Sequence, residues 1–375
     1  MGTPRLLANP RLNRAAVTPP DPRPLLFHRS WPDYQPTPLR EAPAAARRLG
    51  VASVLVKDES MRLGLPSFKI LGASWATYRV LCQRLSVDPA VTPSWDGLAA
   101  QVTGKADLTL VAATDGNHGR AVARMARLLG LAAHILVPAD MVPARRQALT
   151  TEGAEVTVVD GGYDAAVAAS AELADDRHLV ISDTSWPGYT KVPGWVIDGY
   201  STLTGEILTQ LTQEHRPEPS VVVVQIGVGA LAASIARCFR DTPARIVGVE
   251  PASADCVLAS VEAGYPVRLP GRQDSIMAGL NCGSPSLVAW PEVSAGLDVF
   301  TAVEDYEAEE AMRLLARDGI VSGESGAAGL AGLLAFSGEL GLTRHDRILV
   351  ISTEGATDPA GYARIVTAET ASSRR

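Results

Sequence analysis

The sequence predicts an α/β fold with two lobes, each built around a parallel sheet. Short apolar segments of strand length alternate with segments of helical periodicity between residues 108 and 182, and the alternation resumes at residue 220. Repeated strand–helix units of this length join parallel strands through right-handed crossovers. The 375 residues, 46% of them hydrophobic, can bury the core of two such lobes or of one extended domain.

The first hundred residues carry fewer signals. Residues 1–40 are rich in Pro and Arg and show no sustained periodicity, so we expect them to wrap a surface or to fray. A short apolar segment at 51–56 precedes a polar turn, and the stretch 67–81 after Pro66 predicts a helix. Residues 88–105 contain Pro and Gly without a clean period, which indicates a linker.

The two regions of alternation give the remaining expected elements. In the first, strands are expected at 108–113, 132–137, 155–159 and 178–182, with helices at 117–129, 143–151 and 163–174. In the second, strands are expected at 220–225, 245–249 and 347–352, with helices at 230–240, 304–318 and 325–336. These periods favour parallel strands in both lobes.

Charge and hydropathy exclude two classes of partner. Lys and Arg number 34 against 41 Asp and Glu, and the net charge of −7 gives no support to nucleic-acid binding. No apolar run approaches the roughly 20 residues that span a bilayer, so no membrane partner is expected. The N-terminal arginines are not followed by an apolar stretch and a cleavage site, which favours a cytoplasmic location.

The four cysteines predict no metal centre. None of them forms a C-x-x-C pair and the six histidines are scattered, so a structural zinc site is not expected. Reduced thiols are the simplest state for such a chain. A disulfide between Cys256 and Cys282 is the less favoured alternative.

Lys69 is the first candidate for chemistry. It stands in S-F-K-I-L-G near a predicted helix start, with apolar neighbours on both sides. Desolvation and the partial positive charge of the helix N-terminus would lower the pKa of this amine and free it to form a Schiff base. The alternative is a solvated surface lysine.

Two acidic residues follow predicted strands, where open α/β sheets bind their ligands. In T-D-G-N-H-G at 114–119, Asp115 could move a proton and Asn117 could donate to a ring oxygen. Asp183, in D-T-S-W, could act as an acid or a base if it is partly buried. The alternative for all three is a helix cap or a turn residue.

A glycine turn at 227–231 follows the apolar strand and opens a helix, an arrangement that attracts a phosphate. A dinucleotide site would need a third glycine where Ala232 stands, and an acidic residue about 20 positions on, near which Glu250 lies. An NAD-dependent oxidoreductase therefore stays an alternative. A tight strand-to-helix turn without a ligand is another.

The last segment is S-T-E-G-A-T-D at 352–358, whose hydroxyls could hydrogen-bond a pyridine nitrogen, or which could be only a polar loop. A neutral partner would leave that nitrogen mostly unprotonated. Taken together, the segments supply an amine, a phosphate cradle, an amide, a hydroxyl and two carboxylates. This set fits a phosphorylated pyridine aldehyde better than a nicotinamide.

These blocks resemble, in the same order, the tryptophan-synthase-β-like (fold type II) group of pyridoxal-phosphate (PLP) enzymes, and within it the diaminopropionate ammonia-lyases. The resemblance covers residues 34–360 and is carried by Y-Q-P-T-P-L, S-F-K, T-D-G-N-H-G, D-T-S-W-P-G-Y, M-A-G-L-N-C-G and S-T-E-G-A-T-D. It implies a larger PLP-binding domain of residues 1–75 and 205–375, a smaller domain of residues 76–204, and an active site in the cleft between them.

The resemblance also implies a role for each candidate residue. Lys69 would hold PLP as a Schiff base, Asn117 would face the ring oxygen, and Thr353 would face the pyridine nitrogen. Asp115 and Asp183 match acidic residues that the family places near the substrate. The phosphate would be held by Gly227, Val228, Gly229, Ala230 and Leu231.

The implied reaction is the α,β-elimination of 2,3-diaminopropionate to pyruvate and two ammonia molecules, carried out by a homodimer. Lys69 would act on one face of Cα and Asp115 or Asp183 on the other, so that both L and D substrates could react. Pro187 and Trp75 depart from the family pattern, and Pro187 bears on which substrate is used. The alternatives are a serine or threonine dehydratase, a β-replacement synthase, and a PLP-binding protein without turnover.

Overall fold

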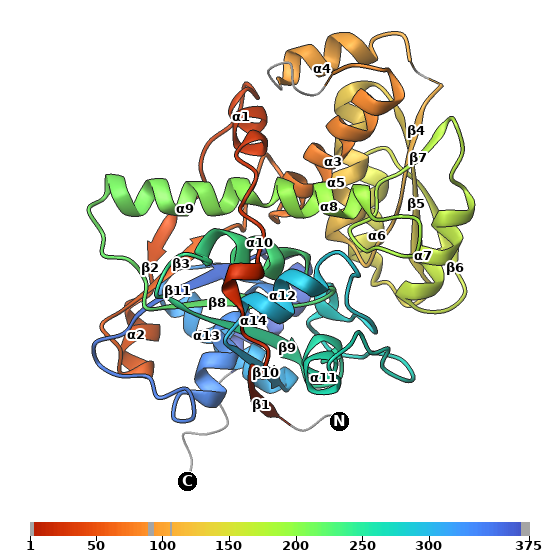
Figure 1. Cartoon of the computed structure of the whole chain (residues 1–375). Helices are drawn as coiled ribbons and strands as arrows, with labels where there is room; N and C mark the ends of the chain where they lie inside the picture. The colour runs from red at the N-terminus through yellow and green to blue at the C-terminus, as the bar shows by residue number, and fades with distance from the viewer. Residues whose placement is uncertain (1–3, 89–93, 106, 369–375) are drawn as a thin grey trace.

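The computed structural model describes residues 4–88, 94–105 and 107–368. It contains two sheets, which confirms the α/β prediction (Figure 1). The seven-stranded sheet has the order β1-β10-β9-β8-β11-β3-β2, with β1 and β2 antiparallel to their neighbours and the inner strands parallel. Its strands are β1 Arg5–Ala8, β2 Leu39–Glu41, β3 Ser53–Asp58, β8 Val221–Gln225, β9 Arg245–Pro251, β10 Val299–Val303 and β11 Arg347–Ser352.

The four-stranded sheet is parallel throughout, in the order β6-β5-β4-β7. Its strands are β4 Thr109–Ala113, β5 Ala132–Pro138, β6 Glu155–Val159 and β7 His178–Val180. The helices of its lobe and of the segment leading to it are α3 Lys69–Arg84, α4 Trp95–Val102, α5 Asn117–Leu129, α6 Pro143–Thr151 and α7 Tyr163–Glu172. This sheet and its helices form the lobe at the upper right of Figure 1.

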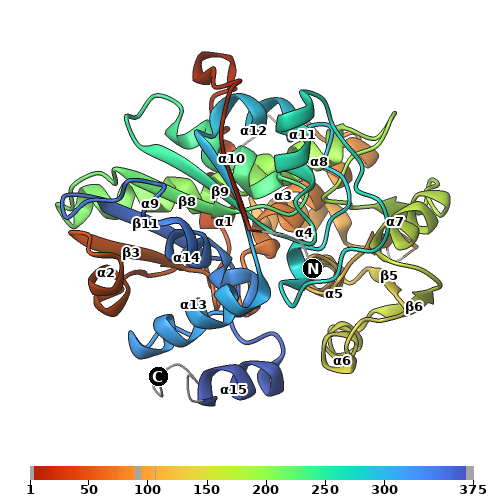
Figure 2. The same cartoon turned by 90° about the horizontal axis from the view of Figure 1, so that it is seen from below.

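The large sheet is covered on both faces, as Figure 2 shows from below. The remaining helices are α1 Arg23–Arg29, α2 Pro43–Leu49, α8 Lys191–Gly199, α9 Ser201–Gln213, α10 Ala230–Phe239, α11 Cys256–Ala263, α12 Trp290–Gly296, α13 Asp305–Arg317, α14 Glu324–Phe336 and α15 Pro359–Thr367. Along β8, Val222 and Val224 belong to the core that includes α10, whereas Val221 and Val223 belong to the core of α13 and α14. Because both faces are buried, β8 is a continuous apolar run.

Of the two expectations for residues 1–40, that they wrap a surface or fray, the described residues 4–40 fit the first, because β1 pairs with β10 and Arg5 lies opposite Ala302. Another expectation for the N-terminal third is wrong. The expected linker at 88–105 contains α4, whose N-cap Ser94 accepts a hydrogen bond from the Gly97 amide at 3.1 Å. A strand as short as β1 and a helix of about two turns such as α4 give little periodicity in the local sequence, so neither was predicted.

Candidate active site

A pocket lies between the two lobes, at the carboxyl ends of β4 and β7 on one side and of β8 and β11 on the other. It brings together residues from all five segments that the sequence singled out. Its lining includes Lys69, Asp115, Asn117, Asp183, Gly227, Val228, Gly229, Ala230, Leu231 and Thr353. It also includes His118, Arg145, Tyr163, Gln225, Cys282 and Glu354, to which the sequence analysis gave no role.

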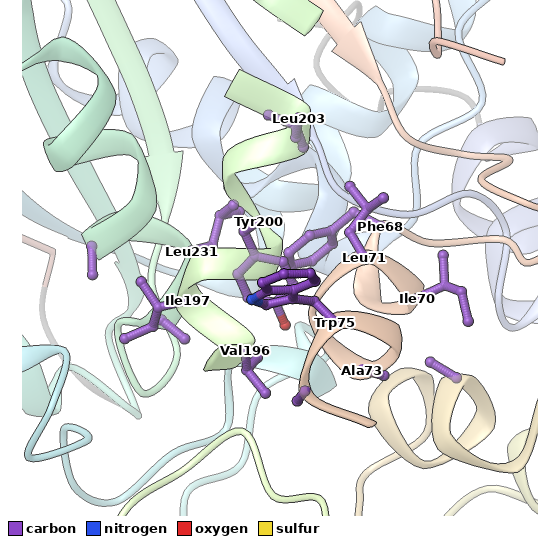
Figure 3. Close-up of a cluster of buried hydrophobic side chains, with 14 of the residues drawn as sticks. Phe68, Ile70, Leu71, Ala73, Trp75, Val196, Ile197, Tyr200, Leu203 and Leu231 are labelled. Carbon is purple, nitrogen blue, oxygen red and sulfur yellow. The ribbon is translucent and has the colours of Figure 1, made fainter. Parts of the chain in front are cut away.

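Lys69 is the first residue of α3, and an apolar cluster fixes this end of the helix (Figure 3). The rings of Phe68 and Tyr200 lie 4.6 Å apart between their centroids. A Cβ on Gly72 would lie 2.6 Å from the Tyr200 ring, so glycine is what allows α3 to lie this close to α8 and α9. Trp75 is fully buried in the same cluster, so a large aromatic is accommodated at this position.

Lys69 donates to Asp183 Oδ2 at 2.6 Å, and its side chain is only 20% exposed. Burial lowers the pKa of Lys69, but the Asp183 carboxylate outweighs burial and holds the pKa above its usual value. The expectation of a desolvated amine with a lowered pKa is therefore wrong for this state. The sequence could not show that a carboxylate more than a hundred positions away faces the amine.

Asp183 has three neighbours in the pocket. Besides Lys69, the Tyr163 hydroxyl donates to Asp183 Oδ1 at 3.1 Å, and His118 Nδ1 lies 3.8 Å from Asp183 Oδ2. Burial would raise the pKa of Asp183, yet the Lys69 ammonium brings it well below its usual value. Asp183 is thus an ionised, buried carboxylate, as an acid–base role requires.

Asp115 behaves differently, although it lines the same pocket. Burial raises the pKa of Asp115 to about 7, and the positive charge of Arg145 limits the rise. The Arg145 side chain packs against Gly116, where a Cβ would lie 3.2 Å from Arg145 Cδ. Asp115 therefore exchanges a proton near neutral pH, whereas Asp183 stays ionised.

Asn117 starts α5, and its side-chain amide donates to Glu354 Oε2. Glu354 is buried, and its other oxygen accepts from the Ser325 amide at 3.2 Å. The amide of Asn117 is therefore held in place from β11, and one of its two N–H groups remains for another acceptor. Glu354 stands inside S-T-E-G-A-T-D, so the motif alone could have drawn attention to it.

The turn at 227–231 has the form that an anion site needs. Gly229 has φ +97°, a conformation that favours glycine, and a Cβ on Gly227 would lie 3.1 Å from Cys282 Sγ. Helix α10 begins at Ala230 with no side-chain cap and no acidic residue in its first turn. The first-turn N–H groups of a helix have no internal acceptor, so this buried helix start suits a phosphate.

Thr353 is held by a buried glutamine. Gln225 Nε2 donates to Thr353 Oγ1 at 2.8 Å, and also to the carbonyl of Ile351 at 3.0 Å. Because the Thr353 hydroxyl accepts this bond, its own hydrogen is free to be donated to a group in the pocket. Gln225 follows four valines, and a polar residue at the end of a buried strand was the one sequence signal for it.

Two alternatives from the sequence do not fit the structure. The Glu250 carboxylate is fully buried and accepts from the backbone amides of Val257 and Leu258 at 2.8 and 2.7 Å, so it caps α11 and is not available to a ribose. Cys256 and Cys282 are free thiols, as are the other two cysteines. Pro187 is exposed in a turn and is not part of the pocket lining, so its departure from the pattern lies away from the site.

Comparisons with known proteins agree with this geometry. A model of the pyridoxal-phosphate dependent enzyme family matches residues 31–354. The chain is 37% identical to a diaminopropionate ammonia-lyase of Salmonella typhimurium, over 91% of this chain and 90% of that protein. A crystal structure of diaminopropionate ammonia-lyase from Escherichia coli in complex with D-serine matches with a TM-score of 0.88 and 33% identity, over 98% of this chain and 97% of that one.

A second structure of that Escherichia coli protein, in complex with an aminoacrylate-PLP azomethine reaction intermediate, matches with a TM-score of 0.86 and 33% identity, over 98% of this chain and 97% of that one. The expected family, fold and cofactor are thereby confirmed. Among the described residues, no helix is both long and apolar enough to cross a bilayer.

Proposed function

The chain belongs to the pyridoxal-phosphate dependent enzymes, and from this premise we propose that it is an ammonia-lyase that acts on 2,3-diaminopropionate. Its cofactor is pyridoxal 5′-phosphate. The observation that carries the proposal is the pocket in which one lysine, two aspartates and an uncapped helix start converge.

The residues of the pocket fit this cofactor. Lys69 is the amine to which the aldehyde would be bonded, and the turn from Gly227 to Leu231 would hold the phosphate. The free N–H of Asn117 would face the ring oxygen. The Thr353 hydroxyl, whose hydrogen is free, would donate to the pyridine nitrogen, and a neutral donor leaves that nitrogen without its own proton.

The two carboxylates and the lysine divide the proton transfers of the elimination. The bound cofactor draws electron density from the substrate's Cα and so makes its proton removable. Lys69 would serve one face of Cα, and Asp115 or Asp183 the other, which would allow both L and D substrates to react. An amine on Cβ leaves only when it is protonated, so one of these groups must also deliver a proton there.

The pocket also suits a substrate with two amino groups. Asp183 is ionised and Asp115 is half-ionised near neutral pH. A charge-assisted hydrogen bond from the second ammonium to a carboxylate would stabilise a dication more than serine or threonine, which carry a neutral hydroxyl there. A second, wider cavity shares Asp115, Arg145 and Tyr163 with the pocket as lining residues.

A side-by-side assay tests the proposal. Purified protein would be supplied with D- and L-2,3-diaminopropionate, L-serine and L-threonine, and pyruvate, 2-oxobutyrate and ammonia would be measured. We expect pyruvate and two equivalents of ammonia from diaminopropionate, with much slower reaction of the hydroxy amino acids. Faster reaction of serine or threonine would show a dehydratase, and product only with a second nucleophile would show a synthase.

Three further expectations remain proposals. We place the larger domain at residues 1–75 and 205–375 and the smaller at 76–204, and the four-stranded sheet supports the division because all its strands lie within the latter range. The division cuts α3 near its middle. A homodimer and a cytoplasmic location are the other two.

A further inference from the structure

His118 is a buried histidine in the pocket whose two ring nitrogens have different surroundings. Nε2 lies 2.7 Å from the carbonyl oxygen of Ile181, an acceptor, so Nε2 must carry the hydrogen of that bond. Nδ1 has no hydrogen-bond partner within the described part of the chain, and the side chain is 4% exposed. A neutral imidazole in this position holds an unused lone pair inside the protein.

The nitrogen with the unused lone pair lies near Asp183. Nδ1 lies 3.8 Å from Asp183 Oδ2, which is the same oxygen that accepts from Lys69 at 2.6 Å. The other oxygen, Oδ1, already accepts from Tyr163 at 3.1 Å. The Lys69 ammonium can only donate to Oδ2, so His118 Nδ1 is the neighbour of Oδ2 that can accept a hydrogen from it.

We propose that His118 is a positioning residue that accepts a hydrogen bond from Asp183 whenever Asp183 carries a proton. The inference rests on the proposed function and takes Asp183, of the two aspartates, as the group that receives a proton from Cα. In that step the C–H bond breaks, its electron pair stays on the substrate, and a new O–H bond forms on Oδ2. That O–H reaches Nδ1 once the pair shortens by about 1 Å.

Without His118, a protonated Asp183 would be a buried acid with no acceptor for its hydrogen, which destabilises the protonated form. The imidazole therefore makes Asp183 a stronger base in the working enzyme. Burial lowers the pKa of His118, which keeps the ring neutral and its lone pair available. The titratable groups that face Asp183 are Lys69, Asp115, His118, Tyr163, Tyr189, Tyr200 and Cys282.

The first test is the protonation of the ring itself. Nitrogen-15 spectra of histidine-labelled apoenzyme, with the His118 signal assigned by its loss in His118→Gln, would be recorded from pH 6 to 8. We expect a neutral ring with hydrogen on Nε2 throughout. A ring that carries hydrogen on Nδ1 at pH 7 would overturn the proposal, because no lone pair would then face Asp183.

The second test is a double-mutant cycle with Asp183→Asn. In the otherwise native enzyme, His118→Phe should lower kcat about tenfold for the diaminopropionate enantiomer that depends more on Asp183, and shift the acidic limb of its pH profile downward. In the Asp183→Asn background the same change should cost less than about twofold. Equal losses in both backgrounds, with an unmoved pH profile, would assign His118 a structural role only.

Two further variants keep the result interpretable. His118→Gln retains a donor for the Ile181 carbonyl, so this variant should fold even if His118→Phe does not. It should still lose the coupling to Asp183. His134→Gln, on β5, removes a ring bonded to Thr157 outside the pocket and should leave the profile unchanged. If the native enzyme releases no ammonia from diaminopropionate, the proposed function fails. If the enzyme is active but the effects of the His118 and Asp183 substitutions are additive, only the role of His118 is contradicted.

Discussion

Two lysines paired with carboxylates illustrate what separates a structural ion pair from a reactive one. Lys57 donates to Glu206 at 2.7 Å, and Lys69 donates to Asp183 at 2.6 Å, so the two contacts have nearly the same length. The Lys57 side chain is fully buried, and it also donates to the Thr37 carbonyl and to Gln210. Lys69 has a single carboxylate and faces a pocket.

The surroundings of the two pairs shift the lysine pKa values in opposite directions. Burial lowers the pKa of Lys57, and its carboxylate partner Glu206 is shared with Arg62. The pKa of Lys69 is raised because Asp183 has no second cation as close. Lys57 has several hydrogen-bond partners within the fold, so its ion pair is structural. Lys69 has one carboxylate partner beside a pocket, so its charge remains available to a ligand.

The largest expected effect follows from removing the reactive lysine. Lys69→Ala should lower turnover of diaminopropionate by at least about 10³-fold, because both the attachment of the cofactor and a proton-transfer group are lost. Borohydride reduction followed by peptide mapping should find the modified lysine at Lys69 in the native protein. A modified peptide elsewhere, or normal elimination by the variant, would refute the assignment.

The matching change at the structural lysine should affect stability instead. Lys57→Met removes one of the two cations that pair with the buried Glu206 and leaves only Arg62. We expect a loss of about 3–5 kcal/mol in the free energy of unfolding. Urea unfolding measures this, with the exposed Lys105→Ala as the control. Turnover per folded molecule should stay the same. A catalytic defect without a loss of stability would erase the distinction between the two lysines.

The carboxylates of the pocket should behave as reactive groups, not as supports. Asp115→Asn and Asp183→Asn should each lower kcat by about 10²-fold or more, with cofactor affinity changed less than about threefold. Titration of the apoenzyme with the cofactor, followed in the visible spectrum, separates the two effects. Loss of the cofactor at unchanged stability would reassign either residue to a structural role.

The pKa of Asp115 predicts a pH dependence near neutrality. As a base, Asp115 must be ionised, and a pKa of about 7 implies that kcat/KM at pH 6 is about tenfold below that at pH 8. Arg145→Gln removes the positive charge that lowers this pKa, so the acidic limb should move to higher pH. A limb that moves to lower pH, or stays in place, would show that Arg145 does not act on Asp115.

The smallest effect concerns the exposed pairs that join the lobes at the mouth of the pocket. Arg268 pairs with Asp164 at 2.7 Å, and Arg272 pairs with Asp140, all four side chains being exposed. Exposed ion pairs contribute little to stability. Replacing both Arg268 and Arg272 with Ala should therefore lower the free energy of unfolding by less than about 1 kcal/mol. KM should change no more than about twofold in low salt. A large loss in kcat would mean that these pairs help to close the site.

Much of the fold could be predicted because it follows from local periodicity. The strand β11 and the helices α5 and α6 have the expected bounds, since β11 is an apolar run, α5 has a periodic apolar face and α6 begins at Pro143. The expectations failed where an element depends on distant partners. β10 is five residues long and passed unnoticed, as did α8 and α9.

The candidate site divides in the same way. The motifs placed Lys69, Asp115, Asn117, Asp183 and Thr353 in one pocket, because each follows a strand or starts a helix at the facing edges of the two sheets. Which groups pair could not be predicted, because pairing depends on packing between the lobes. Three features of the site depend on this packing: the raised pKa of Lys69, the hydrogen bond from Asn117 to Glu354, and the ring nitrogen of His118 that has no hydrogen-bond partner among the described residues.

The pairing of β1 with β10 has a consequence for how the chain is made. During synthesis β1 leaves the ribosome long before β10 exists, so residues 5–8 must wait for almost the whole large sheet before they can dock. Until they do, the outer side of β10 presents unpaired backbone groups that another nascent chain could use. Closure of that edge is therefore a late event, and Arg14, which bonds the Asp298 carboxylate beside β10, helps to complete it.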